Sequence, residues 1–238
     1  MDIIELLPRL HLLRFPVSQA YLWRDGDELT LIDAGPIGAG RTIADAITAL
    51  GRAPQDVRRI VLTHFHEDHV GGAGEFAALH GAEVLAHPSD APFVRGERPG
   101  PPPVFEEWER PIHAEAVRQL PTGTPLPPRS VTDVTDGDVL GFGGGAHVVH
   151  VPGHTDGSIA LFLPAVGVLF TGDTVAAAPA DGTPMPGVFN LDRTRLLASI
   201  SRLADLGAEA ACFGHGAPVM TGAASVLRSL GQDFSERP

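Results

Sequence analysis

Three histidines and one aspartate lie within six residues of one another, directly after a short apolar run. The run covers residues 59–62, and the four side chains that follow it are those of His64, His66, Asp68 and His69. Burying such side chains without partners would cost on the order of a few kcal/mol each, so packing alone does not explain the cluster. Imidazole and carboxylate groups together suit zinc, iron or manganese. The cluster therefore predicts a metal site at the end of a buried strand.

Three further residues that can bind metal stand beside glycines later in the chain. They are His154, Asp173 and His215, within the sequences Pro-Gly-His-Thr, Thr-Gly-Asp and Gly-His-Gly. Glycine lets the backbone turn sharply at the end of a strand, so that the neighbouring side chain projects. Together with the first cluster they supply seven nitrogen and oxygen ligands. Two adjacent metals need about that many ligands while leaving room for water.

The elements that must position these residues follow from the apolar pattern. In the first half, we expect strands over residues 2–7, 10–15, 19–24, 28–33, 59–62 and 83–87, and helices around 43–50 and 73–80. In the second half, we expect strands over 130–135, 139–142, 146–151, 158–163, 167–171 and 208–213, and helices around 196–203, with Asp192 as N-cap, and 223–230. Two runs of strands, each closed by helices, predict an α+β fold, a four-layer sandwich rather than a Rossmann pattern.

Residues 88–129 differ in character from the rest of the chain, because they hold eleven of its 22 prolines. We call them the insert, and we expect one helical segment in it, around residues 104–120. A loop this long within a compact domain is typical of a functional flap, although a surface insertion without a role is the alternative. As a flap, it would form a wall of the substrate pocket. Phe105 and Trp108 would offer apolar surface on the helical segment, and His113 would reach the substrate.

Composition limits the classes of function. The net charge is −12 and all 17 basic residues are arginines, which disfavours a nucleic-acid partner. No apolar stretch approaches the ~18–20 residues of a membrane span, and residues 1–16 lack the pattern of a secretory signal. A single cysteine, Cys212, excludes an internal disulfide framework and a thiolate-rich metal site. We therefore expect a cytoplasmic protein with a small-molecule substrate, no nucleic-acid or membrane partner, and one domain over residues 1–238 that includes the insert.

The order of the four motifs resembles that of the metallo-β-lactamase superfamily of metal-dependent hydrolases. His-x-His-x-Asp-His comes first, and Pro-Gly-His-Thr, Thr-Gly-Asp and Gly-His-Gly follow in that order. The match extends from Asp33 to His215, which is most of the chain. The resemblance implies an αββα sandwich with the site at one edge of two central sheets. It also implies two divalent metal ions, zinc first, with manganese or iron as alternatives.

The resemblance also implies a role for each ligand. The first metal would be held by His64, His66 and His154, the second by Asp68, His69 and His215, and Asp173 would bridge the two. Asp33 resembles the aspartate that hydrogen-bonds the histidine loop and fixes its geometry, the alternative being an ordinary turn aspartate. Asp68 would in addition act in catalysis, by orienting the attacking hydroxide or by taking its proton. These roles amount to a dinuclear hydrolase that attacks its substrate with a metal-bound hydroxide.

Departures from individual branches narrow the substrate to an ester, thioester or lactone bond of a small molecule. Flavodiiron proteins have glutamate at the position of His66, several of the exported β-lactamases have cysteine at that of Asp173, and acyl-homoserine lactonases have tyrosine at that of Ala176. Glyoxalase II has a longer C-terminal helical part than this chain. The loop after Asp173 would give the substrate apolar walls, through Met185, Val188 and Phe189.

Two rival interpretations remain open. Persulfide dioxygenases also carry His-x-His-x-Asp-His but use a single iron, held by two histidines and an aspartate. Their arginine-containing loop is not evident here, because residues 175–190 contain no arginine. The second rival is a non-catalytic binding protein in which metal only stabilises the fold. The intact ligand set argues against it.

Overall fold

The computed structural model describes residues 1–235, and the last three residues of the predicted domain, 236–238, lie outside it. The chain divides into two compact units. Unit 1 comprises Met1–Gly100 and Ala114–Val134, and unit 2 comprises Pro101–His113 and the chain from Thr135 onward. Within the described residues, no helix is both long enough and apolar enough to cross a membrane.

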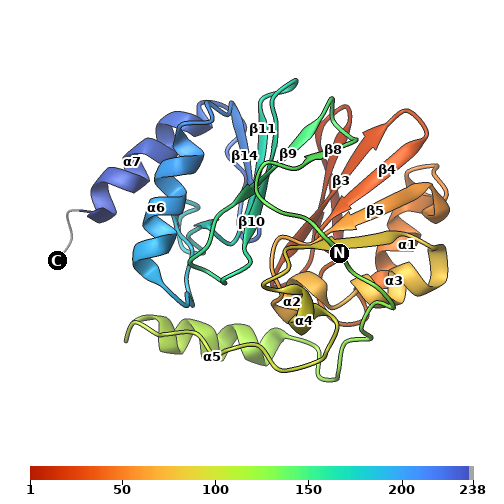
Figure 1. Cartoon of the computed structure of the whole chain (residues 1–238), viewed down its shortest axis with the longest axis horizontal. Coiled ribbons are helices and arrows are strands. Elements are labelled where there is room, and N and C mark those ends of the chain that lie inside the picture. Colours follow the sequence, from red (N-terminus) through yellow and green to blue (C-terminus); the bar gives the residue numbers. More distant parts are fainter. Residues whose placement is uncertain (236–238) are drawn as a thin grey trace. The chain divides into compact units, whose positions relative to one another are not determined.

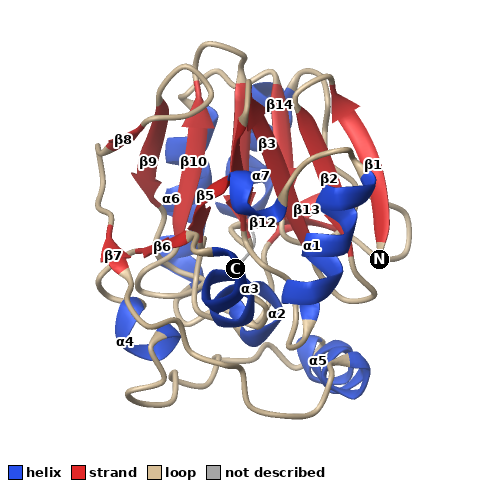
Figure 2. Cartoon of the chain, turned by 90° about the vertical axis from the view of Figure 1, so that its right-hand side faces the viewer, coloured by secondary structure: helices blue, strands red, loops and turns tan. Residues whose placement is uncertain are grey.

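Unit 1 is built on a seven-stranded sheet whose strands follow one another in chain order (Figure 2). Its strands are β1 (Asp2–Leu7), β2 (Leu10–Arg14), β3 (Gln19–Asp25), β4 (Glu28–Ile32), β5 (Val57–Val61), β6 (Glu83–Ala86) and β7 (Thr132–Asp133). The first four pair antiparallel, whereas β4 to β7 pair parallel, because helical crossovers connect β4 with β5 and β5 with β6. The carboxyl ends of β4, β5 and β6 therefore lie at one edge.

The helices of unit 1 are α1 (Ala39–Ala49), the 3-10 turn η1 (Pro54–Asp56), α2 (Glu67–Val70), α3 (Ala73–His80) and α4 (Ala91–Val94). Figure 1 shows α1 and α3 beside the strands β3, β4 and β5. Ile43 and Ile47 of α1 and Phe76 of α3 are fully buried, and they share one core cluster with Leu22 and Leu31 of the sheet. The predicted strands of this half and its helices over 43–50 and 73–80 are confirmed, with ends shifted by a few residues.

Unit 2 holds a five-stranded sheet in the order β14-β11-β10-β9-β8. Its elements are β8 (Val139–Leu140), β9 (Ala146–His150), β10 (Ile159–Leu163), β11 (Val168–Gly172), the ribbon β12 (Val175–Ala177) and β13 (Pro184–Pro186), α6 (Arg193–Ala204), β14 (Ala210–Phe213) and α7 (Ala223–Ser235). Leu196, Ile200 and Leu203 of α6 are buried in a core with Phe213 and Val149. Asp192 caps α6 as predicted, because its side chain accepts a hydrogen bond of 3.0 Å from the Arg195 backbone N–H.

The insert departs from its prediction in two respects. It contains a second short helix, α4, and its main helix α5 (Glu109–Gln119) begins five residues later than residue 104. Proline is accommodated only in the first turn of a helix, where its missing N–H is not needed, and Pro111 is the third residue of α5. The prediction that Phe105 and Trp108 lie on the helical segment was therefore wrong, since both precede it.

Candidate metal centre

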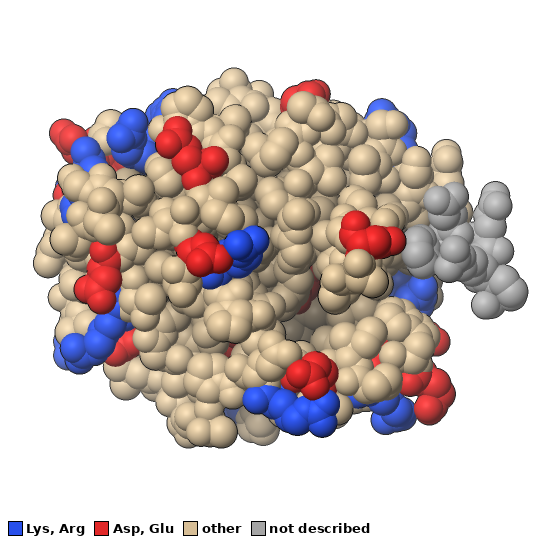
Figure 3. All heavy atoms as spheres, turned by 180° about the vertical axis from the view of Figure 1, so that it is seen from behind, with Lys and Arg blue, Asp and Glu red and all other residues tan. Residues whose placement is uncertain are grey.

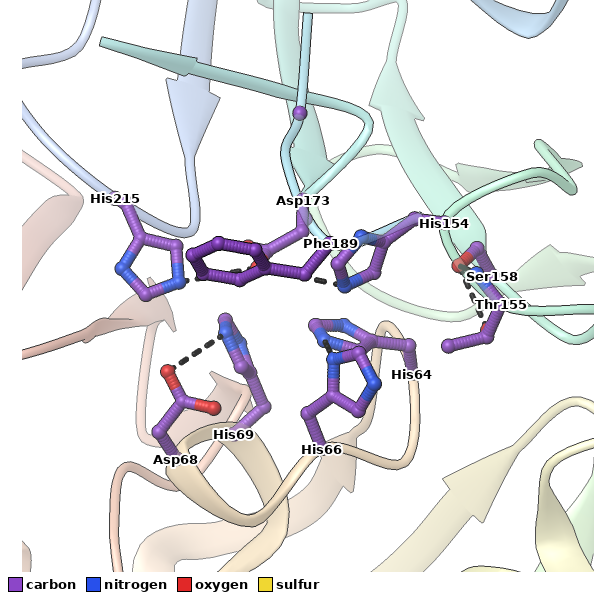
Figure 4. Close-up of polar contacts among 12 residues, drawn as sticks. His64, His66, Asp68, His69, His154, Thr155, Ser158, Asp173, Phe189 and His215 are labelled. Atoms are coloured by element: carbon purple, nitrogen blue, oxygen red, sulfur yellow. Dashed lines mark hydrogen bonds and ion pairs between the residues drawn. The ribbon is translucent and has the colours of Figure 1, made fainter. Parts of the chain in front are cut away.

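The first half-site consists of His64, His66, Asp68 and His69 in unit 1 (Figure 4). His64 and His66 lie in the loop between β5 and α2, and Asp68 and His69 lie in α2. His64 and His69 are buried, whereas His66 and Asp68 are partly exposed. His64 Nε2 lies 3.1 Å from His66 Nδ1, and His69 Nε2 lies 3.5 Å from Asp68 Oδ2. The four side chains therefore form two close pairs of ligand atoms, His64 with His66 and His69 with Asp68, beyond the end of β5.

Asp33 fixes one histidine of this half-site. It follows β4, is 3% exposed, and has a left-handed backbone with φ 58°. Its carboxylate accepts three hydrogen bonds of 2.8 Å, from the backbone N–H and the hydroxyl of Thr63 and from His69 Nδ1. Because a carboxylate only accepts, His69 carries its proton on Nδ1 and presents the lone pair of Nε2. This is the orientation that a metal-ligating imidazole requires.

Asp33 also orients His64, indirectly, through the Thr63 hydroxyl group. Its Nδ1 lies 3.0 Å from the Thr63 hydroxyl oxygen, whose own hydrogen is donated to Asp33. His64 Nδ1 is therefore the donor, and Nε2 presents a lone pair toward His66 Nδ1. Two nitrogen ligands of one tetrahedral zinc, each about 2.0–2.1 Å from it, lie roughly 3.3 Å apart. The 3.1 Å separation of these two nitrogens is close to that geometry.

Glycines allow the loop after β4 to approach the histidine loop closely. A Cβ atom on Gly71 would lie 2.3 Å from the Ile37 backbone nitrogen, and one on Gly72 would lie 2.4 Å from the Ala34 carbonyl oxygen. The Ala34 N–H in turn donates to the His69 carbonyl oxygen at 2.7 Å. Gly71 and Gly72, which follow the histidine cluster in the chain, thus permit the backbone contact that brings Asp33 to His69.

The second half-site consists of His154, Asp173 and His215, which lie in unit 2 after β9, β11 and β14. These three strands run in the same direction, because β9 and β11 are both antiparallel to β10 and β14 is parallel to β11. Their carboxyl ends therefore lie at one edge of the sheet. Asp173 Oδ2 lies 3.0 Å from His215 Nε2 and 3.6 Å from His154 Nε2, so one carboxylate oxygen faces both imidazoles (Figure 4).

Asn190 orients His154, and the sequence did not single it out. Its Oδ1 lies 3.2 Å from His154 Nδ1, and its Nδ2 donates to the Gly187 carbonyl oxygen at 2.6 Å. The second contact identifies Oδ1 as the acceptor, so His154 is protonated on Nδ1 and its Nε2 presents a lone pair. That lone pair and Asp173 Oδ2 are two acceptors facing each other. A cation bound between them satisfies both, so the donor set of this half-site fits a metal.

Cys212 and Glu67 lie close in sequence to these ligands and differ from them chemically. Burial raises the pKa of the fully buried Cys212 thiol, which keeps it protonated. Burial also raises the pKa of Glu67, and the charge of Asp68 adds to this effect. Neither residue is among the seven candidate ligands, whose donor atoms are imidazole nitrogens and carboxylate oxygens.

Three of the predicted substrate contacts come together in unit 2. The rings of Phe105 and His113 have centroids 4.7 Å apart, and those of His113 and Phe189 have centroids 5.0 Å apart. Trp108 is 47% exposed, and Met185 is a half-buried residue of β13 that pairs with Ala176. Their contact with a substrate stays a prediction.

A family model described as the metallo-beta-lactamase superfamily matches residues 13–215. The chain belongs to this superfamily. Together with the relatives that follow, this match confirms the prediction of a metal-dependent hydrolase. The chain is 33% identical over 213 residues to the probable metallo-hydrolase YflN of Bacillus subtilis, an alignment that covers 81% of this chain and 76% of the relative. It is 28% identical over 206 residues to the hydroxyacylglutathione hydrolase of Rhodobacter capsulatus, covering 83% of this chain and 62% of that enzyme.

Solved structures show the same fold in this superfamily of hydrolases. A metallo-beta-lactamase family protein of Thermus thermophilus matches with a TM-score of 0.70 and 28% identity, covering 97% of this chain and 81% of that one. The protein TTHA1623 in a di-iron-bound form matches with a TM-score of 0.62 and 28% identity, covering 86% of this chain and 91% of that one. The predicted fold class, the α+β sandwich of the superfamily, is confirmed.

Proposed function

We propose that the two half-sites together hold two divalent metal ions and that the enzyme hydrolyses an ester, thioester or lactone bond of a small molecule. Zinc is the first candidate metal, with manganese or iron as alternatives. The ligand sets follow the family resemblance: His64, His66 and His154 for the first metal, Asp68, His69 and His215 for the second, and Asp173 between them. The proposal treats residues 1–238 as one domain with the insert at 88–129.

The observation that carries the proposal is the set of protein acceptors that face Nδ1 of three buried histidines. His64, His69 and His154 each direct Nδ1 at an acceptor of the protein, namely Thr63, Asp33 and Asn190. A core histidine needs partners on both ring nitrogens, and water or any polar side chain would serve. Here each ring is turned so that Nε2 presents a lone pair to other ligand atoms. This arrangement matches what protein ligands do for a metal.

The bound metals would supply Lewis acidity, which lowers the pKa of a water molecule and polarises the substrate carbonyl. The chain's own residues orient the reactants and move the proton. Asp68 is partly exposed, and its Oδ2 lies 3.5 Å from His69 Nε2, so this carboxylate is placed to orient the attacking water or to take its proton. Asp33, Thr63 and Asn190 hold the ligands in place, which lowers the cost of reorganisation during the reaction.

The relatives support two parts of this proposal. The hydroxyacylglutathione hydrolase of R. capsulatus is named for cleaving an acylated glutathione, although this chain spans only 62% of that enzyme. The di-iron-bound TTHA1623 holds two metal ions on the same fold at 28% identity. An acyl compound cleaved by a dinuclear centre is therefore the reaction that the relatives favour.

The surface supports a small-molecule substrate. On the face shown in Figure 3, arginines are interspersed with acidic residues and form no continuous basic patch. The net charge of −12 would repel a polyanion. We therefore keep nucleic acid outside the proposed substrates. A cytoplasmic location stays a prediction from the sequence.

The test combines metal analysis with a substrate panel of lactones, thioesters, esters and phosphodiesters. We expect two equivalents of divalent metal and hydrolysis of an acyl substrate. Asp173→Ala should weaken both metals together, His215→Ala mainly one of them, and His147→Ala, an exposed histidine on β9, neither. One iron with oxygen consumption on glutathione persulfide would identify a dioxygenase instead. Metal without turnover of any substrate would identify a binding protein.

A further inference from the structure

Part of the insert is attached to the loop that carries Asn190, within unit 2. The Val104 N–H donates to the Asn190 carbonyl oxygen at 2.9 Å, and the Phe189 N–H donates to Glu109 Oε1 at 3.2 Å. The other oxygen of Glu109 accepts from the Glu106 N–H at 2.9 Å. Glu109 is 1% exposed, which is unusual for a glutamate, and both of its oxygens are used. The carboxylate thus joins the start of α5 to the residue before Asn190.

Phe189 needs such support because of its backbone. Its φ of 60° is left-handed, and among the described residues the only other non-glycine residue with positive φ is Asp33. A bulky residue adopts this conformation only where its surroundings enforce it. The Glu109 hydrogen bond holds its N–H, and the rings of Phe105 and His113 pack around its side chain. The strained residue directly precedes the asparagine that orients His154.

We propose that Glu109 is a positioning residue for the second half-site, which acts through Phe189 and Asn190 on His154. The proposal rests on the proposed function in one respect, that His154 is a metal ligand. By holding the Phe189 backbone left-handed, Glu109 places the Asn190 amide where its Oδ1 meets His154 Nδ1. The insert therefore contributes to the metal centre through a buried carboxylate, without supplying a ligand.

The chemistry of the contact suggests the variant that tests it. Glu109 accepts two N–H groups with its two oxygens, so Glu109→Gln places an NH₂ group against one of these donors. Glu107→Gln is the matched control, because it makes the same chemical change two residues away on a side chain that is 91% exposed. Both variants remove one negative charge. Glu107→Gln also loses an exposed ion pair with Arg110 at 3.2 Å, so it controls for the loss of charge and of a surface contact on the same segment.

The experiment measures metal affinity by competition with a chelator, using zinc as the probe. In Glu109→Gln, we expect one of the two zinc ions to bind about tenfold more weakly and the other as in wild type. Glu107→Gln should bind both as wild type does. Phe189→Gly in the Glu109→Gln background should recover part of the loss, because glycine adopts left-handed φ without strain. Should Glu109→Gln fail to fold, Glu109→Asp replaces it, since its shorter side chain cannot span both donors.

A second readout uses the metal-free protein, so that it does not depend on the proposed function. The ¹⁵N spectrum of His154 should show Nδ1 protonated in wild type and in Glu107→Gln, and a mixture of tautomers in Glu109→Gln. Unchanged zinc affinities and an unchanged His154 spectrum in Glu109→Gln would overturn the inference. Wild-type protein that takes up fewer than two zinc ions would contradict the proposed function, while the His154 spectrum would still decide the role of Glu109.

Discussion

The two half-sites hold their histidines in different ways. In the first, the four donors are nearly contiguous in sequence. One carboxylate, that of Asp33, accepts hydrogen bonds from His69 and Thr63, and the Thr63 hydroxyl in turn accepts one from His64. In the second, three donors come from three strand ends, and an amide, that of Asn190, orients His154. The amide is itself placed by an insert residue, Glu109, through a neighbouring backbone. The side chain that orients His69 thus follows a strand of the sheet, whereas the residue next to the amide that orients His154 is held by the insert.

Both supports involve a left-handed residue, and the type of residue differs. Asp33 has φ 58° and Phe189 has φ 60°. Aspartate tolerates this region several times better than a bulky residue does, so Asp33 needs less help from its surroundings. Phe189 depends on contacts from the insert. The insert also contacts the first half-site, because the Phe65 N–H donates to Asp90 Oδ2 at 3.1 Å. That contact holds the backbone between His64 and His66, whereas in the second half-site the insert acts on the residue next to the asparagine that orients His154.

The largest effect should come from Asp33. Asp33→Ala leaves the buried Thr63 N–H without an acceptor and frees the ring of His69. We expect metal affinity to fall by up to about 100-fold and the free energy of unfolding to fall by about 1–3 kcal/mol or more. Chelator competition and denaturant unfolding measure the two quantities. Asp45→Ala, an exposed aspartate on α1, is the control, and wild-type metal affinity in Asp33→Ala would show that it is only a turn residue.

Asn190→Ala should have a smaller effect, confined to the metal that His154 holds. Only one hydrogen bond to a ligand is lost, so we expect that metal to bind about tenfold more weakly and the other to be unchanged. The same zinc competition resolves the two sites. If Asn190→Ala lowered the affinity for both metals equally, Asn190 would not act on His154 alone, and the contrast with Asp33 would be wrong.

The aromatic residues of the insert should affect substrate binding rather than metal content. Phe105 packs near His113 and Phe189, whereas Trp108 is largely exposed. We therefore expect Phe105→Ala with Trp108→Ala to keep two metals and to raise KM several-fold for whichever substrate the panel identifies, with kcat little changed. Most of the change should appear in Phe105→Ala alone. Wild-type kinetics across the panel would show that this part of the insert is only surface.

The smallest effect should come from a surface ion pair of unit 2, between Arg202 and Asp136, which does not involve Asn190. The Arg202 guanidinium donates to Asp136 and lowers the pKa of that carboxyl, with a further contribution from the His150 N–H. A lowered carboxyl pKa stabilises the fold above the unfolded-state pKa, and this contribution is lost as the pH falls through the folded-state pKa. Arg202→Gln should therefore cost less than about 1 kcal/mol at neutral pH, with both metals unaffected. In unfolding measurements against pH, the two proteins should converge in acid.

Sequence reasoning succeeded where the signal is local and failed where it depends on tertiary contacts. The apolar runs predicted the strands of both sheets, because a buried strand needs a continuous or alternating apolar pattern. The start of α5 was misplaced, since the restriction by Pro111 outweighs the helical pattern before it. Asn190 carries no signal of its own. Its function comes from a contact with a histidine 36 residues away.

The seven proposed ligands also differ in whether local sequence or tertiary contacts reveal them. The residues between His64 and His69 indicate a metal site by spacing alone, because so many ligand-type side chains rarely gather otherwise. His154, Asp173 and His215 are each ambiguous until the strand directions place them at one sheet edge. That step needs the topology or a family resemblance, and neither follows from composition.

The central claim is that the two half-sites serve one pair of metals. Anomalous scattering from crystals of the zinc-loaded protein tests it most directly. The account predicts two peaks, one contacted by His64, His66 and His154 and the other by Asp68, His69 and His215, with Asp173 contacting both. A single peak, or peaks that contact the residues of only one half-site, would contradict it.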